Sequence, residues 1–149
     1  MSPRRPVRPG ERGSSLAEFA IVFTASMLLI MGIVDFGRAM YAYHLISDAA
    51  RMGTRYAIVR GTSCTASGCP ATSTTVQTYV RSLAPELNSA SITVNTTWAT
   101  TSSCNSSPAT SAGCQVTVQV SYPFKFLATP LLPTFTMQID STSKMIISQ

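Results

Sequence analysis

A run of sixteen residues without a charged side chain, Phe19–Val34, constrains this 149-residue chain more than any other feature. As an α-helix the run would span about 24 Å, whereas the hydrocarbon core of a bilayer is about 30 Å thick. Extending the helix back to Ser14 closes that difference and brings Glu18 to the membrane edge. We therefore predict that residues 14–35 form a single transmembrane segment.

A basic leader, residues 1–13, precedes this segment and carries four arginines against one glutamate. Positively charged residues stay on the cytoplasmic side of a membrane. We therefore expect a cytoplasmic N-terminus and an extracytoplasmic location for everything after Asp35. A cleaved signal peptide is an alternative, with a weak cleavage site at residues 37–39. The charges beside that site and the helical pattern through it argue against cleavage there, and an uncleaved signal anchor stays open.

Glu18 is a lone carboxylate at the start of the apolar run. A charged side chain at the bilayer centre costs roughly 2.5–3.5 kcal/mol and less near an interface, so such a residue marks a functional site when a partner can be named. Cleavage between Gly13 and Ser14 would supply that partner, because the new α-ammonium group would lie four positions before Glu18. The alternative is an acid in the first turns of a helix, facing the headgroups and stabilised by the helix dipole.

The helical pattern continues beyond the membrane, and we predict a helical stalk at residues 36–60. One continuous helix over about residues 14–59 would be roughly 70 Å long. Gly32, Gly37 and Gly53 are its expected weak points, because glycine in a helix interior costs about 1 kcal/mol relative to alanine. The positions that recur at helical spacing on one face of the stalk are Phe36, Met40, Tyr43, Ser47, Ala50 and Ala57.

Residues 61–149 are predicted to form one small extracytoplasmic α+β domain with an antiparallel sheet and disulfide-bearing loops. Ser73 or Thr74 is expected to cap a short second helix that stops near Pro85. Alternating apolar residues predict strands, and Pro123 is expected to open an apolar loop that runs to residue 133. The expected strands are Ile92–Asn95, Val116–Tyr122 and Phe135–Ile139, with residues 145–147 continuing or repeating the last one.

Four cysteines, Cys64, Cys69, Cys104 and Cys114, all follow the membrane segment. This distribution favours an oxidising exterior and two disulfides. Among three connectivities we favour the local pairs Cys64–Cys69 and Cys104–Cys114. A zinc site is the alternative, but its ligand spacings would be wide and the single histidine, His44, lies in the stalk.

The net charge and the reactive side chains of the domain argue against two classes of function, nucleic-acid binding and catalysis. The net charge is +5, but residues 14–149 carry only seven basic against five acidic residues, so we expect no nucleic-acid partner. A serine or cysteine site in the domain has no histidine to act as its base, and Glu86 and Asp140 are too few and too isolated to form a catalytic pair of carboxylates. We therefore expect no catalytic residue, no cofactor, no metal and no enzymatic activity.

Three motifs then resemble the TadE-like family: residues 13–20 (GSSLAEFA), residues 32–39 (GIVDFGRA) and residues 48–57 (DAARMGTRYA). The strand at residues 116–126 with the following residues 127–133 is also similar to the closing region of that family. Proteins of the family are pseudopilins or minor pilins of the tight-adherence (Flp, type IVc) pilus system.

The resemblance implies a pilin-like fold, residence in a bacterial inner membrane and a possible place on the surface pilus. It implies cleavage after Gly13 by a prepilin peptidase, so that Ser14 becomes the mature N-terminus and Glu18 the fifth mature residue. Glu18 would neutralise the amine of a neighbouring subunit. The implied partners are membrane lipid, the peptidase, the major pilin and other minor pilins.

Two other functions stay open. One is a signal-anchored extracytoplasmic domain that binds a ligand and never polymerises. The other is a pseudopilin of a type II secretion machine, which shares the cleavage chemistry. The DAAR segment that begins at Asp48 favours the tight-adherence system by resemblance.

Overall fold

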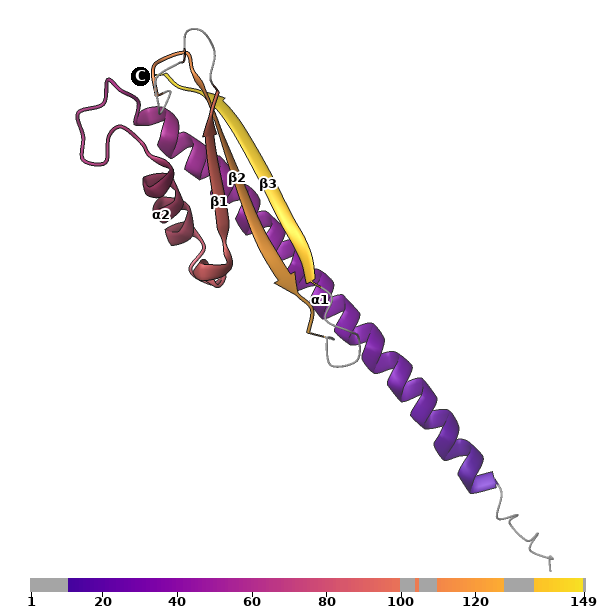
Figure 1. The fold of residues 1–149 in the computed structure, drawn as a ribbon. Helices are drawn as coiled ribbons and strands as arrows, with labels where there is room; N and C mark the ends of the chain where they lie inside the picture. Colours follow the sequence, from indigo (N-terminus) through magenta and orange to yellow (C-terminus); the bar gives the residue numbers. More distant parts are fainter. Residues whose placement is uncertain (1–10, 100–103, 105–109, 128–135, 149) are drawn as a thin grey trace, which may run out of the picture.

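The computed structural model describes residues 11–99, 104, 110–127 and 136–148. Residues 1–10 of the predicted leader and residues 128–133 of the predicted apolar loop lie outside the described residues, as does Phe135 of the third predicted strand. Within the described parts the fold is α+β, as expected. A long N-terminal helix and a short second helix accompany a three-stranded antiparallel sheet (Figure 1).

The first helix, α1, runs without a break over Glu11–Val59, and its 49 residues extend about 74 Å. The predicted continuous helix is confirmed, and it passes through all three glycines that were expected to weaken it. Figure 1 shows that the N-terminal half of α1 projects away from the other elements, whereas the C-terminal half lies along the sheet. One helix therefore serves both as the projecting segment and as part of the domain.

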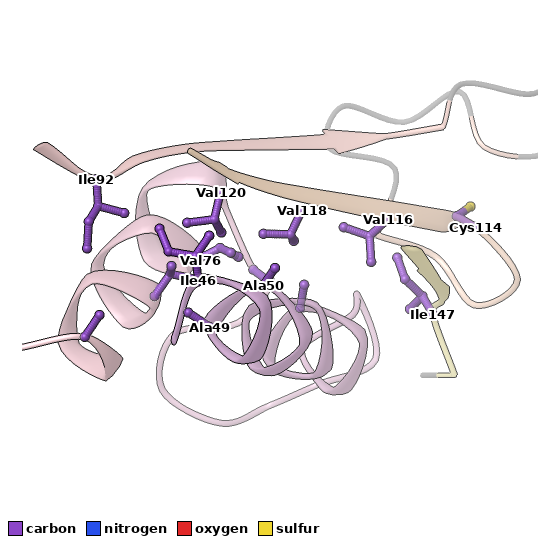
Figure 2. Close-up of a cluster of buried hydrophobic side chains, with 14 of the residues drawn as sticks. Ile46, Ala49, Ala50, Val76, Ile92, Cys114, Val116, Val118, Val120 and Ile147 are labelled. Carbon is purple, nitrogen blue, oxygen red and sulfur yellow. The ribbon is translucent and has the colours of Figure 1, made fainter. Parts of the chain in front are cut away.

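The sheet consists of β1 (Thr93–Trp98), β2 (Gln115–Lys125) and β3 (Thr136–Ile146), in the order β1-β2-β3. Val116, Val118 and Val120 alternate along β2 and are buried against α1 (Figure 2). Because successive side chains of a strand point to opposite faces, the intervening residues of β2 face away from the helix. The inner face of the sheet thus covers one side of α1, and no helix of the described chain lies on the outer face of the sheet (Figure 1).

Two of the predicted strands are longer than expected. β1 continues to Trp98 because Trp98 still pairs with Val116. β2 does not end at Tyr122, and the prediction that Pro123 opens a loop was wrong, since β2 continues to Lys125. The pairing of β1 with β2 stops at Ser121, so beyond that point β2 has a partner only on the β3 side. A proline, which has no N–H to donate, is tolerated on such a free edge.

The second helix, α2 (Ser73–Leu83), is confirmed, but its cap is Thr72 rather than Ser73 or Thr74. The Thr72 hydroxyl accepts from the backbone N–H of Thr75 at 3.3 Å, and the Thr75 hydroxyl accepts from the Thr72 N–H at 2.9 Å. This reciprocal pair satisfies two backbone donors at once. It requires a residue three positions before Thr75, which selects Thr72. A short 3-10 turn, η1 (Ser89–Ser91), then leads into β1.

The core lies between the C-terminal half of α1, α2 and the inner face of the sheet (Figure 2). α1 contributes Ala49 and Ala50, whose small side chains let the sheet approach the helix closely. Valine and isoleucine from the other elements fill the space above them. The larger buried side chains of this core are Ile46, Val76, Val80, Ile92, Val116, Val118, Val120 and Ile147.

The cysteines form the two favoured local pairs. Cys64 joins Cys69 with a Cα–Cα separation of 5.8 Å, and Cys104 joins Cys114 with a separation of 5.7 Å. Cys104 and Cys114 are buried in the core, whereas Cys64 and Cys69 are half-buried in the loop after α1. Because all four sulfurs are joined in pairs, no thiolate is left for the alternative zinc site.

Gly53 is a packing contact rather than a weak point of α1. A Cβ atom on Gly53 would lie 2.5 Å from Cγ2 of Val80 and 3.4 Å from Cγ1 of Val118. The missing side chain therefore lets α1 touch both α2 and the sheet. By contrast, a Cβ atom on Gly37 would meet nothing within 4 Å.

We predict that Gly53→Ala destabilises the domain by about 1–3 kcal/mol, because the added methyl group overpacks the contact with Val80. Gly37→Ala is the matched control and should be neutral or stabilise α1 by about 0.5–1 kcal/mol. The measurement is chemical unfolding of the detergent-solubilised chain, followed by the fluorescence of its single tryptophan, Trp98. Equal stability of Gly53→Ala and the unmodified chain would contradict this packing argument.

Candidate membrane and assembly site

The N-terminal half of α1 carries apolar side chains that the rest of the described chain leaves uncovered. The exposed ones include Leu16, Phe19, Ile21, Val22, Phe23, Leu29, Ile30 and Ile33. A contiguous apolar surface of this size is characteristic of a membrane or protein contact. Among the described residues, α1 is the one helix long and apolar enough to cross a membrane. The structure is therefore consistent with a single-pass membrane protein.

The hydroxyl of Thr24, a polar residue within this apolar helix, is satisfied by the helix itself. The Thr24 hydroxyl donates to the backbone carbonyl of Ala20 at 2.8 Å. Such a bond back to the preceding turn removes a donor that lipid could not satisfy. Phe19 and Phe23 stack one turn apart, with ring centroids at 5.9 Å. From Phe19 onward, this part of α1 therefore suits an apolar environment such as lipid.

Gly13, Ser14 and Glu18 all lie in the first turns of α1 and are exposed. Residues four apart lie one above the other on the same face of a helix, so Ser14 and Glu18 share a face. A Cβ atom on Gly13 would meet nothing within 4 Å. No other described part of the chain covers the candidate cleavage bond, and its use by a peptidase stays a prediction.

Asp35 marks the end of the uncharged run and forms a buried polar joint. Only 4% of Asp35 is exposed, and its carboxylate accepts from the Arg38 guanidinium at 3.1 Å. It also accepts from the backbone N–H of Leu127, at 2.9 Å to Oδ1 and 3.0 Å to Oδ2. A buried carboxylate needs such charge-assisted partners to offset its desolvation. Asp35 thereby ties the start of the stalk to the chain just beyond β2.

Sequence reasoning used Asp35 only as a membrane boundary. Its pairing with Arg38 had a visible signal, because an acid and a base three positions apart lie side by side on a helix. The bond to Leu127 had none, since the two residues are 92 positions apart. That contact depends on the tertiary fold.

A groove of about 590 Å³ opens above Asp35, between α1, the connection from α2 to β1, and the end of β2. We call it the membrane-end groove. Within it the Tyr41 hydroxyl donates a hydrogen bond to Glu86. The residues lining it are Val34, Gly37, Arg38, Tyr41, Ala42, Glu86, Leu87, Asn88, Ser91 and Tyr122–Lys125.

Both signs of charge occur in the membrane-end groove. The hydrogen bond to Glu86, together with desolvation and the negative charge of Glu86, raises the pKa of Tyr41 above its ordinary value of 10.0. Tyr41 therefore stays a neutral donor at physiological pH. One helical turn earlier, the Arg38 guanidinium lies 5.5 Å from the centroid of the Phe124 ring. Among the described residues, no group of three or more histidine, cysteine, aspartate or glutamate side chains is placed to hold a metal ion.

A long apolar helix that packs its second half into a small α+β domain is a pilin-like layout. The comparison with protein families agrees, since the family described as TadE-like protein matches residues 13–55. The match runs from the candidate cleavage bond to just past Gly53, and it confirms the resemblance to the family over residues 13–55; the resemblance at residues 116–133 lies outside the match. A pilus-related structural family of this kind supports involvement in the tight-adherence pilus system in general. Comparisons with curated proteins and with solved structures found no match.

We predict that Asp35→Ala destabilises the domain by about 1–3 kcal/mol, because it leaves the Leu127 N–H without its acceptor and Arg38 without its ion pair. Asp48→Ala is the matched control, since Asp48 is an exposed acid on the same helix, and it should change stability by less than about 0.5 kcal/mol. Trp98 fluorescence during chemical unfolding of the full chain measures both. Indistinguishable curves for the two variants would show that the joint at Asp35 carries no stability.

Proposed function

We propose that this chain is a TadE-like pseudopilin or minor pilin that takes part in assembling a tight-adherence (Flp, type IVc) pilus and in surface adhesion. The observation that carries the proposal is the division of α1. Its C-terminal half is buried in the chain's own domain, whereas its N-terminal half exposes apolar side chains along its length. Residues 13–55, which match the TadE-like family, include both halves. A subunit that moves from lipid into a helix bundle needs this arrangement.

In the proposed pathway the chain enters the inner membrane with its N-terminus in the cytoplasm and its domain outside. A prepilin peptidase cuts between Gly13 and Ser14. The extracytoplasmic side is oxidising, which suits the two disulfides of the domain. The domain then lies on the outside or at the tip of the filament, where it serves as an adhesive or priming module rather than as an enzyme.

Assembly places the apolar half of α1 against the corresponding helices of the major pilin and other minor pilins. Ala20, Ala25 and Gly32 permit close approach, because small residues let helix backbones come together in an apolar medium. A Cβ atom on Gly32 would meet nothing within 4 Å in the single chain, so this close-approach position is available to a neighbour.

Glu18 supplies the specificity of that contact. In a dry bundle its carboxylate attracts a neighbouring subunit's α-ammonium group far more strongly than it would in water. Desolvation of both ions offsets much of that gain. The main effect of the pair is therefore to fix the axial position of one subunit's helix relative to the neighbouring helix. A subunit shifted by one turn would bury an uncompensated charge.

A decisive variant is Glu18→Leu, compared with Glu18→Asp, in cells that carry the pilus system. We expect Glu18→Leu to reach the membrane fraction at the normal level. We expect its amount in sheared surface filaments to fall by about tenfold or more, which corresponds to about 1.4 kcal/mol. Glu18→Asp keeps the charge and should retain part of the assembly.

The control variant is Asp140→Asn, which removes an exposed carboxylate from β3 rather than from α1. It should leave both fractions unchanged. Normal assembly of Glu18→Leu would remove the charge-pairing mechanism and favour the alternative, a signal-anchored extracytoplasmic binding domain that does not polymerise.

A further inference from the structure

The membrane-end groove lies where the domain meets the membrane, if residues 14–35 span it as proposed. Val34, the last residue of the uncharged run, lines the groove. Figure 1 shows η1 and the C-terminal end of β2 at the end of the domain that faces the projecting half of α1. The groove is therefore placed at the depth of the lipid headgroups on the extracytoplasmic side.

The charged side chains of the groove come from three segments: Arg38 from α1, Lys125 from β2, and Glu86 from the connection between α2 and β1. Arg38 comes first after Val34, and Lys125 follows Phe124, whose ring contacts Arg38. Tyr41, which binds Glu86, lies about 4.5 Å farther along the helix axis than Arg38. Arg38 thus lies nearer the proposed membrane segment than Tyr41 and the Glu86 carboxylate that Tyr41 binds.

Donors remain for a ligand on the cationic side. The Arg38 guanidinium has five N–H groups, and the ion pair with Asp35 uses NH1. The Arg38 side chain is 49% exposed, and Lys125 is exposed. On the opposite side, the Tyr41 hydroxyl occupies one oxygen of Glu86, Oε2, and a carboxylate has room for further donors.

We propose that the membrane-end groove binds one phospholipid with a zwitterionic headgroup that carries a primary ammonium, as in phosphatidylethanolamine. The phosphate contacts Arg38 and Lys125, and the ammonium donates to Glu86. This inference rests on the proposed membrane insertion of α1.

The order of the charged groups in the lipid headgroup is the reason for proposing this ligand. In such a lipid the phosphate lies next to the glycerol, and two methylene groups carry the ammonium farther from the hydrocarbon. The groove presents Arg38 and the Glu86 carboxylate in the same order. An anionic lipid would match Arg38 and Lys125 but would offer no positive charge to Glu86, whose hydrogen-bond partner is the neutral Tyr41 hydroxyl. Tyr41 and Tyr122 add rings of the kind that favour membrane interfaces.

The binding would fix the tilt of the domain over the membrane before assembly. Arg38 and Asp35 belong to the joint that links α1 to the chain after β2, so a lipid held by Arg38 acts on that joint directly. Release of the lipid would accompany extraction of α1 into a filament.

The test uses the full chain, delipidated in detergent and titrated separately with phosphatidylethanolamine, phosphatidylglycerol and phosphatidylcholine. Native mass spectrometry measures the fraction of chain that retains one lipid. We expect phosphatidylethanolamine to be retained about tenfold more tightly than the other two, the effect of one additional charge-assisted hydrogen bond. Phosphatidylcholine is the informative comparison, because its quaternary ammonium cannot donate to Glu86.

Single-residue variants test which side chain contacts the ammonium and which contacts the phosphate. Glu86→Gln should abolish the preference for phosphatidylethanolamine over phosphatidylglycerol, and Arg38→Gln or Lys125→Gln should weaken retention of both. Lys125 is exposed, so its variant tests the phosphate contact without disturbing the Asp35 ion pair. Lys144→Gln and Asp140→Asn remove exposed charges from β3 and should change nothing.

Equal retention of the three lipids, a preference unaffected by Glu86→Gln, or a retention unaffected by Lys125→Gln would each overturn the lipid site. The filament assay on Glu18→Leu distinguishes this failure from failure of the proposed function. A chain that assembles through Glu18 but shows no headgroup preference would retain its proposed function and lose only the lipid site.

Discussion

The unbroken hydrogen-bond ladder of α1 is the feature on which the rest of the molecule depends. Lipid offers backbone N–H and C=O groups no partners, so only a segment that satisfies them internally can cross a membrane. The same helix, continued to Val59, supplies one wall of the domain core through alanines and Gly53. Its side chains change character along its length, from large and exposed to small and buried. A single element thereby links an exposed apolar surface to a folded domain.

Asp35 lies where the exposed, apolar part of α1 meets the part that is buried in the domain. Its buried carboxylate accepts hydrogen bonds from Arg38 on the same helix and from the N–H of Leu127, just beyond the C-terminal end of β2. The domain is therefore fastened to α1 at the end nearest the projecting half, and it covers only the C-terminal part of the helix. The membrane-end groove forms beside this joint, with its charges supplied by α1, β2 and the segment before β1.

The sequence pattern predicted those elements of the fold that depend on residues close together in the chain. The uncharged run and the helical spacing after it predicted α1, and the alternation of Val116, Val118 and Val120 predicted β2 because those side chains face one core. Thr72 was missed because several consecutive hydroxyl residues can each cap α2. The Asp35–Leu127 contact and the free edge that admits Pro123 arise only once distant segments meet. The role of Glu18 concerns a second subunit, so a single chain leaves it a prediction.

The most direct test of the account is the intact mass of the membrane-extracted chain, expressed with and without a prepilin peptidase. The account predicts that residues 1–13 are lost only when the peptidase is present, which would establish Gly13–Ser14 as the cleaved bond. A full-length mass under both conditions would contradict processing and would indicate a permanently anchored extracytoplasmic domain. Glu18 would then lack the ammonium partner on which the proposed assembly depends.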